Sequence, residues 1–146
     1  MSRVSLIGFP LSISANTIIE NAITGSGDDA ITCNIAANTI TCGLGDDTVY
    51  DISTGDSVYG GDGNDRFWII AGDFTLIDGG SGDYDTLNFT GSSVDLSSYT
   101  DAQITGIEVI SITPNSNSTL LTLSQQSILD LESNHILDVD GDEDYD

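Results

Sequence analysis

Apolar side chains recur every nine residues through the middle of the chain. Six consecutive blocks of nine residues run from residue 24 to residue 77, and the eighth place of each block is apolar: Ile31, Ile40, Val49, Val58, Phe67 and Leu76. A strand alternates its two faces, so the middle residue of a short strand points inward when its neighbours point outward. The pattern predicts a repeating unit made of a loop of about six residues and a strand of about three.

A second period, of eighteen residues, is superimposed on the first. Alternate blocks keep the pattern Gly-x-Gly followed by aspartate, whereas the blocks that start at residues 33, 51 and 69 have largely lost it. Two units complete one turn of a solenoid, so the acidic loops fall on one edge, which we call the aspartate edge, and the others fall on the opposite edge. The acidic loops are TGSGDDAIT (24–32), CGLGDDTVY (42–50), GGDGNDRFW (60–68) and the enlarged DGGSGDYDTLNF (78–89).

The predicted fold is all-β. Residues 24–89 are expected to form a right-handed parallel β-roll, a β-solenoid with two nine-residue units per turn and its strands stacked into two parallel sheets. A solenoid end exposes unpaired strand groups and the apolar interior, so both flanks are expected to be caps. Residues 1–23 read as lead-in strands, and residues 90–146 as a C-terminal capping segment with short strands over 93–113 and 116–123, room for one short helix over 124–132, and an acidic tail.

The chain is strongly acidic. It carries 24 Asp and Glu residues against Arg3 and Arg66, for a net charge of −22. Nucleic acids and anionic membranes bind basic surfaces, so both are excluded as partners. No apolar run reaches the roughly 18 residues of a membrane-spanning helix, so we expect no membrane insertion. At 38% hydrophobic residues the chain is not expected to be disordered throughout. The excess negative charge favours a bound cation.

The stacked loops have the chemistry of calcium sites. Calcium takes about six to eight oxygen ligands and combines carboxylates with backbone carbonyls. One loop cannot surround the ion, but two loops stacked one turn apart can, so we expect about three sites on the aspartate edge and a weaker fourth on the opposite edge. The candidate ligands are the sixth-position residues Asp29, Asp47, Asp65 and Asp85, the loop glycines Gly25, Gly27, Gly43, Gly45, Gly61, Gly63, Gly80 and Gly82, and, on the opposite edge, Asn38 and Asp56.

Place in the stack distinguishes these acids from one another. Asp47 is expected to serve two sites, one shared with Asp29 and one with Asp65, so its loss should damage two sites at once. Asp28 and Asp46 occupy the fifth position, where the backbone carbonyl matters more than the side chain, and are expected to be solvated. Glycines at positions one, two and four allow positive φ and let the backbone coil tightly with its carbonyls turned inward.

Other residues that often carry chemistry form no convincing site in the sequence. His135 is the only histidine, no zinc-type spacing surrounds it, and the chain has no Gly-x-Ser-x-Gly elbow, so we expect no enzymatic activity. Asp138, Asp140 and Asp142 suggest an EF-hand, but Glu143 stands where that loop needs glycine. An exposed tail and a looser calcium contact against the cap remain the two interpretations of these acids.

The cysteines and the outward aromatic residues each have a plain structural interpretation. Cys33 and Cys42 replace first-position glycines on opposite edges, farther apart than the roughly 7 Å between Cα atoms that a disulfide allows. We interpret them as small substitutes for glycine, with intermolecular pairing as the alternative. Tyr50 and Trp68 lie one turn apart on the outer face, either as an adhesive patch or as cross-strand packing under the flanking segments.

The repeats resemble a known family. The blocks match the Gly-Gly-x-Gly-x-Asp-x-U-x nonapeptide of RTX proteins over residues 24–89, apart from the two cysteines and the three weaker blocks. The stretch TIIENAITGSGDDAITCNIAANTITCGLGDD looks like the lead-in to the β-roll of serralysin-type secreted proteases. Farther along, ITGIEVISIT followed by STLLTLSQQSILDLESNHILDVDGD resembles the segment after the repeats in large RTX adhesins and biofilm-associated surface proteins.

The resemblance implies a function and a location. It implies calcium-ligating loops and export by type I secretion machinery that reads an uncleaved C-terminal signal, so the protein is expected to be secreted from a Gram-negative bacterium or held on its surface. We expect a calcium-binding structural and folding module of an RTX adhesin, disordered at low calcium and folding on calcium binding after secretion. The alternative is the non-catalytic C-terminal domain of a secreted hydrolase, a serralysin-like protease or a lipase. In both cases further domains of a larger parent protein are expected.

Overall fold

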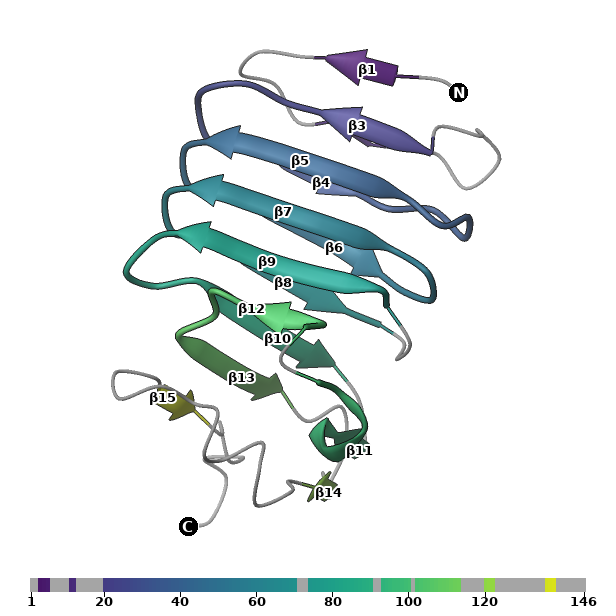
Figure 1. Ribbon diagram of the computed structural model, residues 1–146, viewed down its shortest axis with the longest axis vertical. Coiled ribbons are helices and arrows are strands. Elements are labelled where there is room, and N and C mark those ends of the chain that lie inside the picture. The colour runs from purple at the N-terminus through teal and green to yellow at the C-terminus, as the bar shows by residue number, and fades with distance from the viewer. Residues whose placement is uncertain are drawn as a thin grey trace, which may run out of the picture.

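The computed structural model describes residues 3–5, 11–12, 20–70, 74–90, 93–100, 102–113, 120–122 and 136–138. These residues form a parallel β-roll of about four turns with almost no helix, so the predicted all-β fold is confirmed. The strands lie in two layers, and successive turns follow one another from the N-terminal to the C-terminal end (Figure 1).

Two parallel sheets face each other across the interior. The first contains, in spatial order, β1 (Arg3–Ser5), β3 (Asn21–Ile23), β5 (Thr39–Leu44), β7 (Ser57–Asp62), β9 (Leu76–Ser81) and β12 (Ile104–Thr105). The second contains β15 (Ile136–Asp138), β13 (Val109–Thr113), β10 (Thr86–Thr90), β8 (Arg66–Ile69), β6 (Thr48–Ile52), β4 (Ala30–Thr32) and β2 (Leu11–Ser12). Separately, β11 (Ser93–Asp95) pairs with β14 (Leu120–Thr122), and a short 3-10 helix, η1 (Leu96–Ser98), follows β11.

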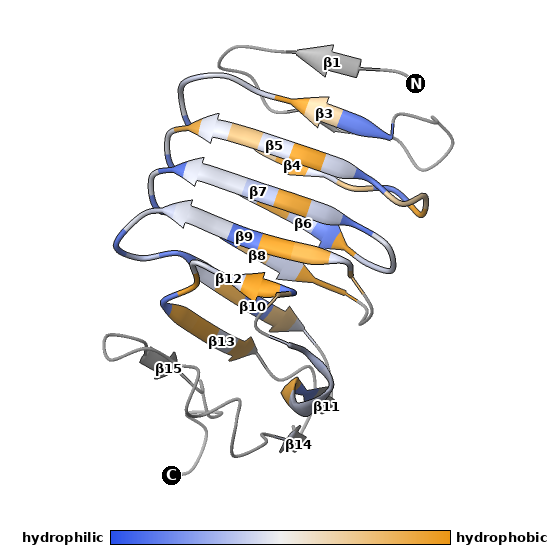
Figure 2. Cartoon of the chain, in the orientation of Figure 1, coloured by the Kyte–Doolittle hydropathy of each residue, from blue (hydrophilic) through white to orange (hydrophobic). Residues whose placement is uncertain are grey.

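The pairing register confirms the eighteen-residue turn. Ile31 lies beside Val49 in one sheet, and Ile40 lies beside Val58 in the other. These four side chains and Phe67 are fully buried, as the nine-residue pattern predicts. Apolar residues occupy the middle of the strands, whereas hydrophilic residues gather at the loops (Figure 2). The interior is therefore a double row of apolar side chains between two columns of loops.

The last repeat is displaced from the predicted register. Val58 pairs with Ile77, which is fully buried, while Leu76 is only partly buried. The prediction that Leu76 faces the interior was wrong, because the loop before β9 holds one residue more than a nine-residue block provides. The next loop also holds one more, so the turn from Phe67 to its partner Leu87 contains two additional residues in total. The roll absorbs the additional residues in its loops, and its strands stay aligned apart from a register shift between Val49 and Ile52 in the pairing of β6 with β8.

The two sheets continue past the acidic repeats. β12 pairs with β9, β13 pairs with β10, and β15 pairs with β13, all in parallel. At the other end β1 and β3 extend the first sheet and β2 extends the second. Short strands predicted over 93–113 are present, whereas the helix predicted over 124–132 and residues 139–146 lie outside the described residues. Within the described ranges, no helix is long and apolar enough to cross a membrane.

Candidate metal centre

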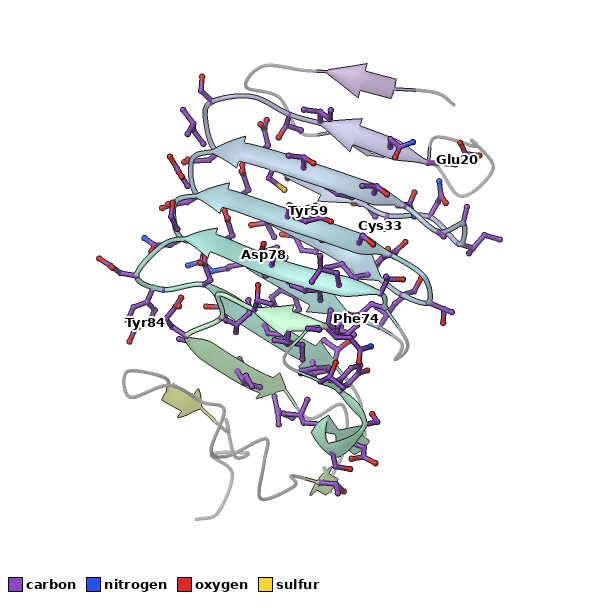
Figure 3. All side chains as sticks on the ribbon, viewed as in Figure 1. Glu20, Cys33, Tyr59, Phe74, Asp78 and Tyr84 are labelled. Carbon is purple, nitrogen blue, oxygen red and sulfur yellow. The ribbon has the colours of Figure 1, made fainter. Side chains whose placement is uncertain are left out.

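The four sixth-position aspartates of the aspartate edge point into the roll. Asp29 is 3% exposed, Asp47 1%, and Asp65 and Asp85 0%. They belong to the loops that follow the first-sheet strands β3, β5, β7 and β9. Tyr84, in the last of these loops, is labelled in Figure 3. Ionisable acids are almost never buried unless they are paired. We call this column of carboxylates the aspartate ladder and each member a rung.

Each rung holds the backbone of the turn before it. Asp47 Oδ1 accepts a hydrogen bond from Asp29 N–H at 2.7 Å, Asp65 Oδ1 accepts from Asp47 N–H at 2.8 Å, and Asp85 Oδ1 accepts from Asp65 N–H at 2.7 Å. The stacking of loops one turn apart thus brings all four predicted ligands into one column. These bonds use only one oxygen of each carboxylate.

The remaining carboxylate oxygens of the ladder have no hydrogen-bond partner. Oδ2 of Asp47, Asp65 and Asp85 and both oxygens of Asp29 are buried without one. An unsatisfied buried polar atom costs about 1–3 kcal/mol, and more when it carries charge, so each exception in a native structure needs an explanation. Arg66, the one Lys or Arg whose side chain the structure describes, is exposed. A column of such oxygens without basic partners indicates a place for a cation.

Backbone carbonyls from neighbouring turns converge on these oxygens. A Cβ placed on Gly60 would collide with both Asp65 Oδ2 and the Gly79 carbonyl oxygen. A Cβ on Gly82 would collide with the carbonyl oxygen of Gly63 and lie 2.9 Å from Asp85 Oδ2. A carboxylate of one turn and a carbonyl of an adjacent turn therefore meet at the same point. This combination of oxygens is the ligand chemistry of calcium.

The loop glycines have two different roles. Positive φ occurs at position two in Gly43, Gly61 and Gly80 and at position four in Gly27, Gly45 and Gly63, with values between +105° and +132°. Gly25 and Gly82 have no positive φ, and neither does Gly60 at position one. Position one therefore does not use the positive φ that glycine allows. Gly60 is required for space, because a side chain there would fill the point where carboxylate and carbonyl meet.

The predicted glycine ligands lie on the aspartate edge, either in its loops or at the ends of the strands that lead into them, but not all of their carbonyls are open. The Gly25 carbonyl accepts a hydrogen bond from Leu44 N–H at 2.9 Å. Gly43 lies beside Gly61, and Gly61 beside Gly80, within the first sheet. These position-two carbonyls point along the stack toward the next turn, since the Gly61 carbonyl oxygen would meet a Cβ on Gly80.

Burial raises the pKa values of three rungs. The pKa of Asp65 rises to about 7, and those of Asp47 and Asp85 rise to about 6. Loss of water is the largest cause, the hydrogen bond from the preceding rung's N–H lowers each pKa, and neighbouring carboxylates raise it. The folded protein thus disfavours the charged form of these groups, although an ordinary carboxyl is fully charged at neutral pH.

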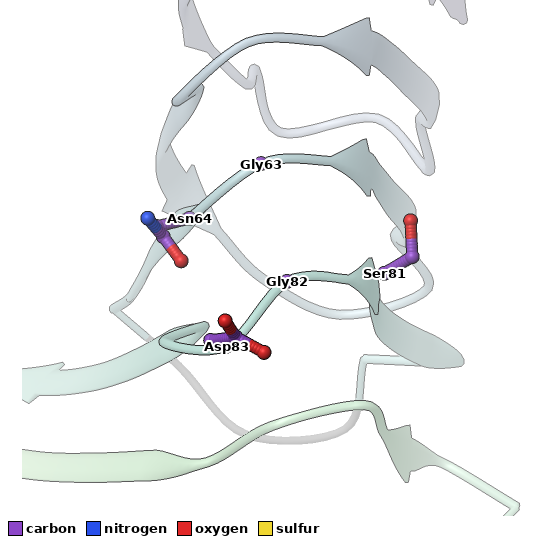
Figure 4. Close-up of a pocket in the computed structure, with 5 residues that line it drawn as sticks. All are labelled: Gly63, Asn64, Ser81, Gly82 and Asp83. Carbon is purple, nitrogen blue, oxygen red and sulfur yellow. The ribbon is translucent and has the colours of Figure 1, made fainter.

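Outside the ladder, a second column of polar residues faces solvent. Asp28 and Asp46 are exposed, as predicted. Asp46 N–H donates to Asp28 Oδ1 at 3.0 Å, and Asn64 N–H donates to Asp46 Oδ1 at 2.8 Å. Figure 4 shows two adjacent turns one above the other, with a shallow depression lined by Gly63, Asn64, Ser81, Gly82 and Asp83. The exposed carboxylates of Asp28 and Asp46 thus accept hydrogen bonds from backbone N–H groups at the surface, whereas the carboxylates of the ladder lie inside the roll.

The opposite edge satisfies its carboxylate and its amide nitrogen internally, although Asn38 Oδ1 is buried without a hydrogen-bond partner. Asn38 Nδ2 donates to Asp56 Oδ1 at 3.0 Å, to the Asn34 carbonyl at 3.2 Å and to the Ala36 carbonyl. Three acceptors around one end of the amide identify that end as the nitrogen. Asp56 Oδ1 also accepts from Asn38 N–H at 2.7 Å, and Asp56 Oδ2 accepts from Ser53 N–H at 2.8 Å. The structure brings the predicted pair together, but it places an N–H donor where a cation would sit.

One turn later, the opposite edge becomes apolar. Phe74 is 1% exposed and stacks on Tyr99, with ring centroids 4.7 Å apart and an interplanar angle of 9°. Figure 3 labels Phe74 and Cys33 on this side of the molecule, across the roll from Tyr84. The two edges therefore differ in chemistry at every level of the stack.

Both cysteines are buried free thiols. Burial raises the pKa of Cys33 to about 12, with smaller contributions from Asp56 and Asp51, and it raises the pKa of Cys42 further still. Asp47 and Asp65 also raise the pKa of Cys42, which lies close to the ladder. Thiols held this firmly in the protonated form are unreactive.

On the outer face, Tyr50 and Trp68 stack on each other, with centroids 6.3 Å apart and an interplanar angle of 16°.

One member of the ladder is missing from the sequence prediction. Glu108 Oε2 accepts a hydrogen bond from Asp85 N–H at 2.8 Å, as each rung does for the rung before it. The nine-residue pattern does not reach this glutamate, because Glu108 follows Thr105 by only three residues, whereas Asp85 follows Asp78, the pairing partner of Thr105, by seven. The glycine two places before it, in Gly106-Ile107-Glu108, was the available signal.

No group of three or more His, Cys, Asp or Glu side chains forms a metal site on its own within the described part of the chain. A site between two stacked loops draws on two carboxylates and completes its shell with carbonyls, so it falls below that number. His135, Asp140 and Asp142 lie outside the described residues.

Comparison of the chain with family models, with curated proteins and with solved structures finds no match.

Proposed function

We propose that this chain is a calcium-binding structural and folding module of a secreted or cell-surface protein, with calcium held between successive loops of the aspartate edge. The observation that carries the proposal is the column of buried carboxylate oxygens without partners in Asp29, Asp47, Asp65 and Asp85. The expected sites lie between consecutive rungs, where carboxylate and carbonyl oxygens of adjacent turns approach one another.

The donor set favours calcium over other common metals. All the candidate donors are hard oxygens, and the thiol closest to the ladder, Cys42, is held protonated by burial. Zinc and copper prefer nitrogen and sulfur ligands. Magnesium demands a small octahedral shell and keeps several waters, whereas calcium accepts the larger and less regular shells that two loops with carbonyls and carboxylates supply.

Binding of calcium is expected to be coupled to folding. In the absence of metal the ladder places like charges one above another inside the roll, and the pKa values of its rungs register that cost. A ligand that binds only the folded chain stabilises it, by about 2.7 kcal/mol per site at a concentration 100 times Kd. Calcium therefore acts as a structural component, and the chain would fold where calcium is abundant.

The biological setting rests on the sequence resemblance. Export in an unfolded form through type I secretion machinery, followed by folding in extracellular calcium, is consistent with a module whose fold depends on the ion. The segment after the repeats suggests an RTX adhesin as the parent protein. The lead-in to the first repeat, which resembles that of serralysin-type secreted proteases, keeps the non-catalytic C-terminal domain of a secreted hydrolase as the alternative.

A calcium titration of the full chain tests the proposal. Metal-free protein is titrated from about 10 µM to about 10 mM calcium, a range that covers the affinities of extracellular calcium modules. Calorimetry should show heat of binding, and circular dichroism should show β-structure that grows with calcium. Magnesium and an equal ionic strength of sodium chloride are the controls for charge screening. Full β-structure in chelator together with no heat on calcium addition would contradict the proposal.

A further inference from the structure

The loop after β12 repeats the sixth position of the acidic loops. Val109 at the start of β13 pairs with Thr86 at the start of β10, so the residues before them, Glu108 and Asp85, are equivalent. The backbone agrees, because Val109 N–H donates to the Asp85 carbonyl at 2.9 Å, as Thr86 N–H donates to the Asp65 carbonyl at 2.8 Å. Glu108 is therefore the sixth-position residue of one more turn on the aspartate edge.

Glu108 also binds as a rung does. Its Oε2 accepts from Asp85 N–H at 2.8 Å, while the three bonds between aspartate rungs measure 2.7–2.8 Å. The connection that carries it is shorter, because Glu108 follows Thr105 by three residues, whereas Asp85 follows Asp78, the pairing partner of Thr105, by seven. A glutamate side chain is one methylene longer than aspartate, so it reaches the same position from the shorter loop.

The oxygens around Glu108 repeat the arrangement found at the rungs. Asp85 is fully buried, and its Oδ2 has no hydrogen-bond partner. A Cβ on Gly79 would lie 2.7 Å from Asp85 Oδ2 and would collide with the Gly106 carbonyl oxygen. Over Gly60, Asp65 Oδ2 meets the next turn's carbonyl in the same way. An unpartnered buried carboxylate and a carbonyl of the following turn therefore converge beside Glu108.

On the basis of the proposed function, we propose that Asp85, Glu108 and the Gly106 carbonyl form a further calcium site at the C-terminal end of the aspartate ladder. Its donors are again hard oxygens, two carboxylates and a carbonyl from two stacked loops. The site joins the last acidic loop to β12 and β13. Calcium then stabilises the pairing of β12 with β9 and of β13 with β10, beyond the nine-residue repeats.

Glu108→Gln tests this site, because it removes the charge but keeps an oxygen that accepts from Asp85 N–H. The matched control is Glu20→Gln, the same change at a partly buried position at the start of β3. Calorimetry on the full chain should find one calcium fewer per molecule in Glu108→Gln than in the wild type. Hydrogen exchange in saturating calcium should be faster over residues 104–113 in that variant, and the control should match the wild type in both measurements.

Two other results would overturn the site, and they can be told apart. If the wild type binds calcium and Glu108→Gln has the same stoichiometry, affinity and exchange, the site does not exist but the proposed function stands. If the wild type takes up no calcium, the proposed function and this site fail together. Should Glu108→Gln fold poorly, Glu108→Asp provides the second measurement: it keeps the charge on a shorter side chain, so the site should bind calcium more weakly but remain countable. Wild-type affinity in Glu108→Asp would argue against ligation by Glu108.

Discussion

The two edges of this β-roll close the same backbone turn with opposite chemistry. On the aspartate edge, the carboxylates of consecutive turns stack with one oxygen each left without a partner. On the opposite edge, Asn38 inserts an amide N–H₂ among two carbonyls and the carboxylate of Asp56, and both oxygens of Asp56 are satisfied. The Asn38 amide thus does internally what a cation is proposed to do on the aspartate edge.

This difference shows that where a turn directs a carboxylate inward, a donating side chain can satisfy it without a metal. Backbone carbonyls and a carboxylate turn inward at the ends of the strands on both edges. A neutral amide supplies donors that are always present, whereas a bound ion depends on its concentration. We therefore expect the opposite edge to keep its bonds at any calcium concentration and the aspartate edge to respond to calcium.

Removal of a central rung should give the largest effect. Asp47→Ala deletes the acceptor for Asp29 N–H and a ligand of two proposed sites, so we expect a loss of about 3–5 kcal/mol of stability in calcium and of two bound ions. Asp29→Ala, at the end of the ladder, should cost one ion. Thermal unfolding and calorimetry measure both quantities.

The neighbouring residue provides the control for this comparison. Asp46→Ala removes the same charge from an exposed position and should cost about 1 kcal/mol or less, through loss of the bond from Asn64 N–H. Equal losses in Asp46→Ala and Asp47→Ala would mean that overall charge, and not the buried ladder, controls stability.

Asn38→Asp should convert the opposite edge to the chemistry of the aspartate edge. The variant loses the three Nδ2 donations and places a second carboxylate against Asp56, so we expect a loss of about 2–3 kcal/mol in chelator. Calcium should restore that stability and add one ion to the stoichiometry. The exposed Asn64→Asp is the matched control. A loss in Asn38→Asp that calcium does not recover would refute the equivalence of the two edges.

A methyl group at position one should separate ion binding from backbone strain. In Gly60→Ala the new Cβ meets Asp65 Oδ2 and the Gly79 carbonyl, so we expect calcium affinity at that level to fall about tenfold, which is about 1.4 kcal/mol. Gly27→Ala meets no atom within 4 Å but has φ +132°, so its cost should be similar with and without calcium. Calorimetry and melting curves in both conditions distinguish the two. Calcium-independent losses in both variants would remove the role assigned to Gly60.

A graded effect is expected from pH, and its sign differs with and without calcium. The pKa of Asp65 is about 7 in the folded chain against an ordinary value of 3.8, so the folded state binds more protons than the unfolded state between these limits. In chelator the roll should therefore gain about 1 kcal/mol per pH unit as pH falls from about 7.5 to about 5.5. In calcium it should lose stability over the same window, because protons compete with the ion. Melting temperatures measure both slopes, and parallel slopes would show that the ladder does not titrate with folding.

Local pattern predicted much of this structure. The nine-residue spacing of apolar residues identifies the buried positions Ile31, Ile40, Val49, Val58 and Phe67, because each strand and its loop form a repeating local unit. The same spacing placed Asp29, Asp47, Asp65 and Asp85 in one column, which the pairing register bears out. Period alone carries this information, because parallel strands stack residues that are one turn apart.

The sequence predictions fail where loops change length, or where the donor and the acceptor of a side-chain hydrogen bond have to be told apart. Leu76 was placed inward because the residue inserted before β9 cannot be located from apolarity alone when Ile77 follows it. Glu108 was missed because its loop is contracted and breaks the period. The role of Asn38 depends on which end of its amide faces Asp56, and only the surrounding acceptors decide that.

The constant register of the central turns also fixes a unit of length. Each turn adds eighteen residues and one strand to each sheet, and neighbouring strands lie about 4.8 Å apart. Because each rung bonds to the rung one turn earlier, a second copy of residues 42–59 placed after residue 59 would meet partners like those of the original. The length of the roll therefore increases by one strand spacing for each added turn, and each such turn brings one more inward carboxylate.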